Sequence, residues 1–317
     1  MTDSPENKRI FRILSIDGGG IRGVYPAYIL KRMEEEWNVD WRNRFQLIAG
    51  TSTGSIIAAG LACGRPASEI VTLYDQHAEI IFQRRQFHRL GLFGSRYNNT
   101  GLKKALTSTF GDIRLGDLTT PLNIPATNIG NGCVHVFKSA YDAGFVRDRT
   151  VLVRDAVLAS CSAPTYFDPC QVQEYALADG GLWANNPALA AAIDAKRRMN
   201  KSLEQLRILT LGTGTGKQFY PQKKTFGSHV MGWGFATRWK RQRFIGMLLN
   251  LQAETATNML GLMLDRSQIL RLNFESNTPL PLDDIRDIPD LKAKAALDFT
   301  YNADRIKAFL IEGQEET

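Results

Sequence analysis

The chain has 317 residues, of which 44% are hydrophobic and 22% are charged, as in globular proteins that bury a sizeable core. A formal net charge of +7 either favours anionic partners, such as a lipid surface or a nucleotide, or serves solubility alone. The aromatic content is 9% and the sequence carries no nucleic-acid-binding motif, so nucleic acid is excluded as a partner.

Three further features of the sequence narrow the class of protein. The longest apolar runs, such as SIIAAGLA, are too short to span a bilayer, and the N-terminus lacks the order of a signal peptide. The four cysteines form no C-x-x-C pair and have no histidine at zinc-like spacing. We therefore expect reduced thiols, no metal and no cofactor, in a cytoplasmic protein. If this protein meets a membrane, it associates peripherally, from the water side.

Apolar runs and helical patterns alternate along the first two-thirds of the chain. Buried strands are predicted at 9–16, 44–49, 122–128, 133–138 and 206–214. Helices are predicted at 24–37, 54–63, 67–82, 150–164 and 187–199. We expect the third and fourth strands to form a hairpin, Ser68 to cap the third helix, and residues 92–101 to form a loop. Such alternation predicts an α/β fold with a mostly parallel sheet.

The strand signal weakens beyond about residue 215. A long helix is predicted from Phe244 to Asp265, then a strand at 266–274, and a last helix from Pro289. We expect a single domain over residues 1–317. Its motif-bearing core covers about 10–215, and the remainder, about 216–317, forms a helical cap region.

The segment SIDGGGIRG joins a predicted strand to a predicted helix. It formally satisfies the dinucleotide pattern G-x-G-x-x-G, but the next strand ends without the acidic residue that such a site requires. Successive glycines at a helix N-terminus can instead turn their N–H groups toward one anion, such as the oxyanion of a tetrahedral intermediate. The expected oxyanion hole consists of Gly18, Gly19, Gly20 and Arg22. A turn that binds nothing is the alternative.

The segment GTSTG, residues 50–54, also joins a strand to a helix. A serine between two glycines at such a turn is the pattern of a nucleophile elbow, where Gly50 and Gly54 relieve crowding. An ordinary tight connection is the alternative. Because a candidate oxyanion hole lies one strand earlier, we predict that Ser52 is a nucleophile.

A nucleophilic serine needs a base, and a histidine is the usual one. The four histidines are His77, His88, His135 and His229. Only His229 comes late enough for the order of an α/β-hydrolase triad, and it follows no obvious strand. The other three have the sequence environment of structural or surface residues.

The segment YALADGGLWANNP supplies a different base. Gly180 and Gly181 let the chain turn with the carboxylate of Asp179 projecting from the turn. Taken alone, this segment has the pattern of an ordinary Asp-Gly turn. Only its combination with the two earlier motifs gives Asp179 a chemical role.

Together the three segments resemble the patatin-like phospholipase family, whose signature is D-G-G-G-x-R-G, then G-x-S-x-G, then D-G-G. The resemblance runs from about Arg12 to about Thr215 and includes SAPTYFDP, NNP and LTLGTGT. It implies a three-layer α/β/α fold and metal-free hydrolysis of phospholipid acyl esters. It also implies that Asp179 pairs directly with Ser52 as a catalytic dyad without histidine, which requires hydrogen-bond reach between them.

The chain is also similar to bacterial phospholipase effectors of antiphage (CBASS) defence, in its compact size, its RILSIDGGGIRG segment and its basic, tryptophan-containing stretch. That similarity implies a cyclic dinucleotide activator; a homo-oligomer is left open. Residues 228–265 interleave apolar and basic side chains, which either contact a phospholipid membrane surface or divide into core and solvated face. An unregulated lysophospholipase or esterase and a non-enzymatic nucleotide- or lipid-binding module remain alternatives.

Overall fold

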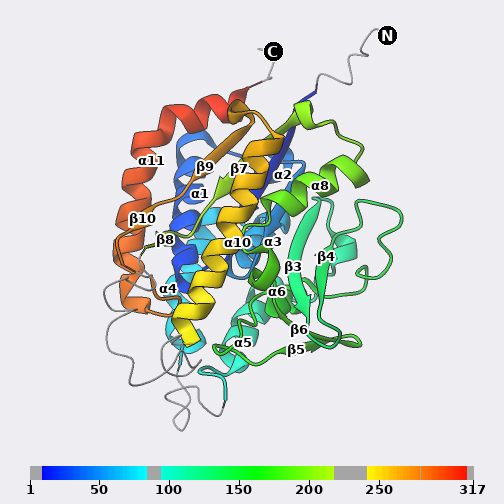
Figure 1. Ribbon diagram of the computed structural model, residues 1–317, viewed down its shortest axis with the longest axis vertical. Coiled ribbons are helices and arrows are strands. Elements are labelled where there is room, and N and C mark those ends of the chain that lie inside the picture. Colours follow the sequence, from blue (N-terminus) through cyan, green and yellow to red (C-terminus); the bar gives the residue numbers. More distant parts are fainter. Residues whose placement is uncertain (1–8, 84–93, 218–240, 279, 313–317) are drawn as a thin grey trace, which may run out of the picture.

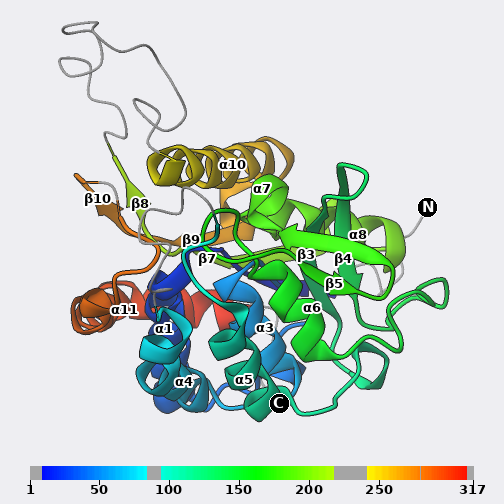
Figure 2. The ribbon, with the colours of Figure 1, turned by 90° about the horizontal axis from the view of Figure 1, so that it is seen from below.

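The computed structural model describes residues 9–83, 94–217, 241–278 and 280–312, and has a central sheet between two layers of helices (Figures 1 and 2). Its strands are β1 Phe11–Ile16, β2 Leu47–Gly50, β3 Leu122–Asn128, β4 Cys133–Lys138, β5 Cys170–Val172, β6 Tyr175–Asp179, β7 Leu206–Leu211, β8 Thr215–Gly216, β9 Ile269–Leu272 and β10 Glu275–Ser276. Its helices are α1 Val24–Trp37, α2 Trp41–Arg44, α3 Thr53–Ala62, α4 Ala67–Ile81, α5 Asn99–Phe110, α6 Val153–Ser160, α7 Gly181–Ala184, α8 Ala188–Arg198, α10 Arg241–Met263 and α11 Ile288–Ile311.

The centre of the main sheet is parallel. Strand β1 pairs in parallel with β2 and β7, β2 with β3, and β7 with β9. Strands β4, β5 and β6 form the antiparallel part next to β3. The expected α/β fold with a mostly parallel sheet is therefore confirmed, and so is the hairpin of 122–128 with 133–138.

Both faces of the sheet are covered, which explains why β1 is buried along its whole length. Successive side chains of a strand point to opposite faces. Accordingly, Leu14 and Ile16 belong to the larger apolar cluster, with α1, α3 and α4, whereas Phe11 and Ile13 belong to a second cluster with α8. Figure 2 shows α10 and α8 on one side of the sheet, and α1, α3, α4 and α11 on the other.

The C-terminal region contributes to the central sheet as well as to the helical layers. Strand β9 pairs with β7, and α11 packs against α1 (Figure 1). The ring of Phe299 lies 5.3 Å from that of Trp37, and Tyr25 donates a hydrogen bond of 2.8 Å to Asp298. Strand β9 and helix α11 thus supply part of the sheet and of the core.

Several local expectations were wrong. Helix α4 begins at Ala67 after Pro66, so Ser68 lies inside its first turn and does not cap it. The expected loop at 92–101 runs into α5, whose N-cap is Asn98. The helix expected at 150–164 is shorter in the structure, where α6 covers Val153–Ser160. The residues after Ser160 turn before Pro164.

We expect Phe299→Ala to lower the free energy of unfolding by about 3–5 kcal/mol, because it opens a cavity between α11 and α1. Phe299 is 3% exposed, whereas Tyr301 on the same helix is 77% exposed. Tyr301→Ala is therefore the matched control, with a change within about 0.5 kcal/mol. Urea unfolding followed by circular dichroism measures both. Equal stability of the two variants would contradict the integration of α11 into the core.

Candidate active site

Three chain segments meet at one end of the sheet. Residues 18–20, which we call the glycine segment, follow β1; Ser52 follows β2, and Asp179 is the last residue of β6. The Ser52 hydroxyl donates a hydrogen bond of 2.7 Å to Asp179 Oδ2, and both residues are buried. The geometry is that which direct proton transfer from serine to aspartate requires.

The pairing of β3 brings these two residues together. Strand β4 occupies one edge of β3 from Asn123 to Asn128. A strand has two edges, so β2 and β6 share the other one. Strand β2 runs parallel to β3, and β6 runs antiparallel to it and ends with Asp179 opposite Ala126. The last residues of β2 and β6 therefore approach each other along the same edge.

Ser52 sits on a strained turn. Its φ is 53° and its ψ −125°, a conformation that non-glycine residues rarely adopt, and α3 begins at the next residue. A Cβ on Gly54 would overlap the carbonyl oxygen of Ile16, and a Cβ on Gly50 would overlap Gly54. The two glycines thus allow the close approach of backbone that a nucleophile elbow needs.

The glycine segment is fixed by contacts from three other segments. Gly18 N–H donates to the Asn185 carbonyl at 2.9 Å, and Thr213 Oγ1 donates to the Gly18 carbonyl at 2.7 Å. Gly20 has a φ of 60°, and a Cβ there would overlap the carbonyl of Leu282. These contacts orient the turn between β1 and α1.

Arg22 also contacts the glycine segment. Its guanidinium donates to the carbonyls of Gly19 and Gly214, at 3.1 and 3.0 Å. Arg22 lines a different cavity from the one that contains Ser52. Burial lowers the pKa of Arg22 to about 10, which leaves it charged at neutral pH. The structure therefore places this side chain against the carbonyls that shape the glycine segment, and away from the serine.

Three backbone donors remain beside the serine. In the described part of the chain, the N–H groups of Gly19, Gly20 and Thr53 have no hydrogen-bond acceptor. All three residues line the cavity that Ser52 and Asp179 line. Thr53 is not among the site residues expected from the sequence, although it directly follows the nucleophile in the elbow pattern and begins α3.

The protonation of Asp179 is set mainly by its burial. Desolvation raises the pKa of Asp179 to about 7, although hydrogen bonds from Gly181 N–H and the Ser52 hydroxyl oppose the rise. The Gly181 bond to Oδ1 is 2.7 Å long. No ion pair joins Asp179 to another described residue. A carboxylate with this pKa is half-ionised near neutral pH, which suits a general base.

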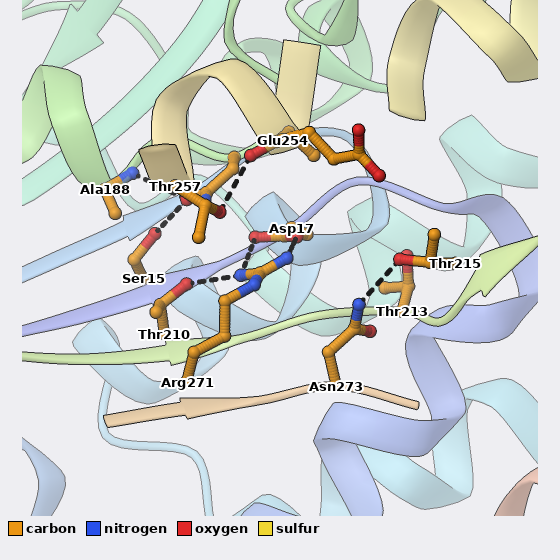
Figure 3. Close-up of polar contacts among 12 residues, drawn as sticks. Ser15, Asp17, Ala188, Thr210, Thr213, Thr215, Glu254, Thr257, Arg271 and Asn273 are labelled. Carbon is orange, nitrogen blue, oxygen red and sulfur yellow. Dashed lines mark hydrogen bonds and ion pairs between the residues drawn. The ribbon is translucent and has the colours of Figure 1, made fainter. Parts of the chain in front are cut away.

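A second buried carboxylate supports the glycine segment. Arg271 from β9 contacts Asp17 at 2.6 Å and also donates to Thr210 Oγ1 at 2.7 Å (Figure 3). Burial raises the pKa of Asp17, and the charge of Arg271 opposes that rise. Figure 3 also shows Asn273 bonded to Thr215 beside this pair. No sequence motif includes Arg271, which lies far along the chain from the three motifs.

The cavity beside Ser52 and Asp179 is narrow, with a volume of about 60 Å³, and mostly apolar. Its apolar lining comes chiefly from α4, α5 and the segment 163–167, with one residue of α10: Leu73, Ala78, Ile81, Leu102, Tyr166, Phe167 and Leu249. Asn185 also lines it, and the Asn185 Oδ1 atom is buried without a partner. The lining suits an apolar group.

None of the described histidines reaches this cavity. His135 lies in β4, packs against Phe137, and burial lowers its pKa to about 4. His77 lies on α4 and is not among the residues that line the cavity. His88 and His229 lie outside the described residues. Within the described ranges, no group of three or more His, Cys, Asp or Glu could hold a metal ion.

The segment 228–265 is only partly described. Within this segment, residues 228–240 lie outside the described ranges. On α10, Ile245 and Leu249 are buried, whereas Leu251 is 49% exposed. No helix of the described chain combines the length and the apolarity needed to cross a bilayer.

We expect Arg271→Met to lower the free energy of unfolding by about 3–5 kcal/mol, because it leaves the Asp17 carboxylate buried without its cation. The double variant Asp17→Asn/Arg271→Met should recover much of this loss, because it removes both charges. Urea unfolding of the four proteins completes the double-mutant cycle. Additive losses in the double variant would contradict a direct coupling.

Asp179 has a folded pKa of about 7 against an unperturbed 3.8. Its contribution to stability is therefore complete below about pH 4 and is lost as the pH rises through about 7. Asp179→Asn removes this loss. The unfolding free energy of the variant minus that of wild type should therefore increase by about 2–3 kcal/mol when the pH is raised from 5 to 8. Urea unfolding at both pH values measures it, with exposed Asp304→Asn as control; a difference independent of pH would count against the raised pKa.

Comparisons with known proteins identify the family of this chain. A family model described as patatin-like phospholipase matches residues 14–192. A cGAMP-activated phospholipase of Pseudomonas aeruginosa is 34% identical over 65% of this chain and 63% of its own length. A cGAMP-activated phospholipase of Escherichia coli is 33% identical over 74% of this chain and 72% of its own. A cUMP-AMP-activated phospholipase of Escherichia coli is 28% identical over 98% and 91%. The chain belongs to the patatin-like phospholipase family.

Proposed function

We propose that this protein hydrolyses acyl esters of phospholipids, with Ser52 as nucleophile and Asp179 as its base. The observation that carries the proposal is the 2.7 Å hydrogen bond between these two buried side chains at a strained turn. Family membership supports the substrate class, because the family model and the relatives above are described as phospholipases.

The reaction follows from the geometry in two halves. Ser52 Oγ attacks the ester carbonyl carbon while its proton passes to Asp179 Oδ2. The tetrahedral intermediate collapses, the C–O bond to the alcohol breaks, and Asp179 returns the proton to the departing alcohol, which is a lysophospholipid. A water molecule then attacks the acyl-serine, Asp179 takes the proton of that water, and the fatty acid leaves as Ser52 is reprotonated.

The developing oxyanion needs donors that are already oriented. The N–H groups of Gly19, Gly20 and Thr53 line the cavity without acceptors of their own, so they are the donors in this proposal. Gly18 N–H is already bonded to Asn185, and Arg22 is bonded to carbonyls. Gly18 and Arg22 are therefore positioning residues of the oxyanion hole.

A cyclic dinucleotide is the proposed activator. The support is that three relatives of this chain bear the names cGAMP- or cUMP-AMP-activated phospholipase. In this proposal the activator raises the rate of the Ser52 reaction at a membrane surface. Activity that is high without nucleotide and unchanged by any cyclic dinucleotide would favour an unregulated esterase instead.

We expect Ser52→Ala and Asp179→Ala each to reduce phospholipid hydrolysis by at least about 10³-fold, because nucleophile and base act as a unit. The pair His77→Gln and His135→Phe is the matched control and should retain activity. Fatty acid release from phospholipid micelles, with cGAMP and with cUMP-AMP, measures all variants. Wild-type protein that binds a cyclic dinucleotide but releases no fatty acid would favour a non-enzymatic binding module.

The pH dependence follows from the pKa of the base. Only ionised Asp179 can accept the serine proton, so kcat/KM should rise with pH up to about 7 and then level off. Initial rates between pH 5 and pH 9 on one ester measure the profile. A plateau that already extends down to pH 5 would contradict Asp179 as the base.

A further inference from the structure

A concavity larger than the one beside Ser52 lies at the opposite end of the sheet. Two adjoining cavities of about 710 and 360 Å³ share Arg9, Ile10, Asn43 and Gln46 in their linings. These residues precede β1 or β2, whereas the glycine segment and Ser52 follow those strands. Figure 1 shows α2, at this end, far from β6, which carries Asp179.

The linings of these cavities are strongly cationic. We call them together the basic groove, defined by its five cationic residues Arg9, Arg12, Arg42, Arg44 and Lys201. Its one acidic lining residue is Asp40, whose carboxylate caps α2 by accepting from Arg42 N–H and Asn43 Nδ2, at 3.1 and 2.6 Å. Arg9, Arg42 and Lys201 form no ion pair with any residue in the described ranges. The groove thus presents a clear excess of positive charge, with five cationic lining residues and one acidic one.

Arg12 adds a buried positive charge to this groove. It is 7% exposed, and its Nε atom has no hydrogen-bond partner. It lies opposite Arg207 in the pairing of β1 with β7, and burial and the charge of Arg44 lower its pKa. Glu312 is the carboxylate beside these guanidinium groups, and it pairs with Arg207. Like charges on neighbouring strands repel, so an anion in the groove would stabilise this arrangement.

We propose that the basic groove binds a nucleotide that carries two phosphate groups and is the site of the cyclic dinucleotide activator. This inference rests on the proposed function. Arg9, Arg42 and Lys201 surround the larger cavity and would bind one phosphate. Arg12 and Arg44 line the smaller cavity and bind the other.

Two further features favour a soluble nucleotide over a phospholipid head group. Asn43 is exposed, lines both cavities and offers its amide oxygen to the edge of a base. A bilayer on the groove would also face the end of the sheet away from Ser52, where the proposed chemistry takes place.

Two strands connect the groove to the active site. Strand β1 runs from Phe11, in the groove, over six residues, about 20 Å, to the glycine segment. Strand β2 begins directly after Gln46 and leads to Ser52. A ligand that shifts the start of either strand therefore acts on the oxyanion hole or the nucleophile through a single rigid element.

The test removes two exposed or half-buried cations that take no part in the proposed chemistry. Arg9→Gln/Lys201→Gln should raise the dissociation constant of cGAMP or cUMP-AMP by about 10- to 100-fold, and the activator concentration for half-maximal phospholipid hydrolysis by the same factor. The control Lys104→Gln/Lys307→Gln removes the same charge from exposed positions outside the groove and should bind as wild type does. Isothermal titration calorimetry measures binding, with inorganic pyrophosphate and phosphatidylglycerol vesicles as further probes.

The outcomes separate this inference from the proposed function. Hydrolysis of a soluble short-chain ester without nucleotide reports the Ser52 chemistry alone and should be equal in wild type and both double variants. Unchanged cyclic dinucleotide binding in Arg9→Gln/Lys201→Gln overturns the groove as the activator site, while leaving the hydrolase intact. The groove is also overturned as the activator site if the wild-type protein binds vesicles through these residues but binds no cyclic dinucleotide. Wild type without any ester hydrolysis, yet with groove-dependent nucleotide binding, overturns the proposed function and not the site.

Discussion

Strand β4 occupies one edge of β3, so β2 and β6 must divide the other edge between them. Because they run in opposite directions along it, their last residues converge. This brings Ser52 and Asp179, which are 127 residues apart in the chain, to 2.7 Å. The glycines of the elbow allow the backbone approach that holds Ser52 at its strained φ. The remaining parts of the site are arranged around this convergence.

Two carboxylates near this point, Asp17 and Asp179, are buried, and they differ in their hydrogen-bond partners. Asp17 has Arg271 as its cation, so its charge is compensated and the glycine segment that follows it is anchored to β9. Among the described residues, the carboxylate of Asp179 has only neutral hydrogen-bond donors, Gly181 N–H and the Ser52 hydroxyl. Burial therefore raises its pKa to about 7, into the range where a carboxylate can both take and return a proton. A cation beside Asp179 would lower its pKa and weaken the base.

The two ends of the parallel strands have opposite character. At the carboxyl ends a narrow apolar cavity adjoins Ser52, and at the amino ends lies the basic groove. Strands β1 and β2 join them directly. This arrangement keeps a charged ligand away from a base whose pKa depends on a dry, uncharged environment. In the proposal that the groove binds the activator, β1 and β2 are the elements that connect the two sites.

Features of the sequence that depend on neighbours along the chain were sufficient to predict the helix Val24–Trp37, the hairpin of β3 with β4, and the strand–turn–helix setting of Ser52. Periodicity, turn residues and glycine spacing act over a few residues, so one sequence displays them. The sequence did not reveal α5, whose start at Asn99 lies in an Asn- and Gly-rich stretch, nor the free N–H of Thr53. Arg271 meets Asp17 across 254 residues, and the basic groove collects cations from three segments. Only tertiary structure decides such contacts, because they depend on which strands pair and which loops share an end of the sheet.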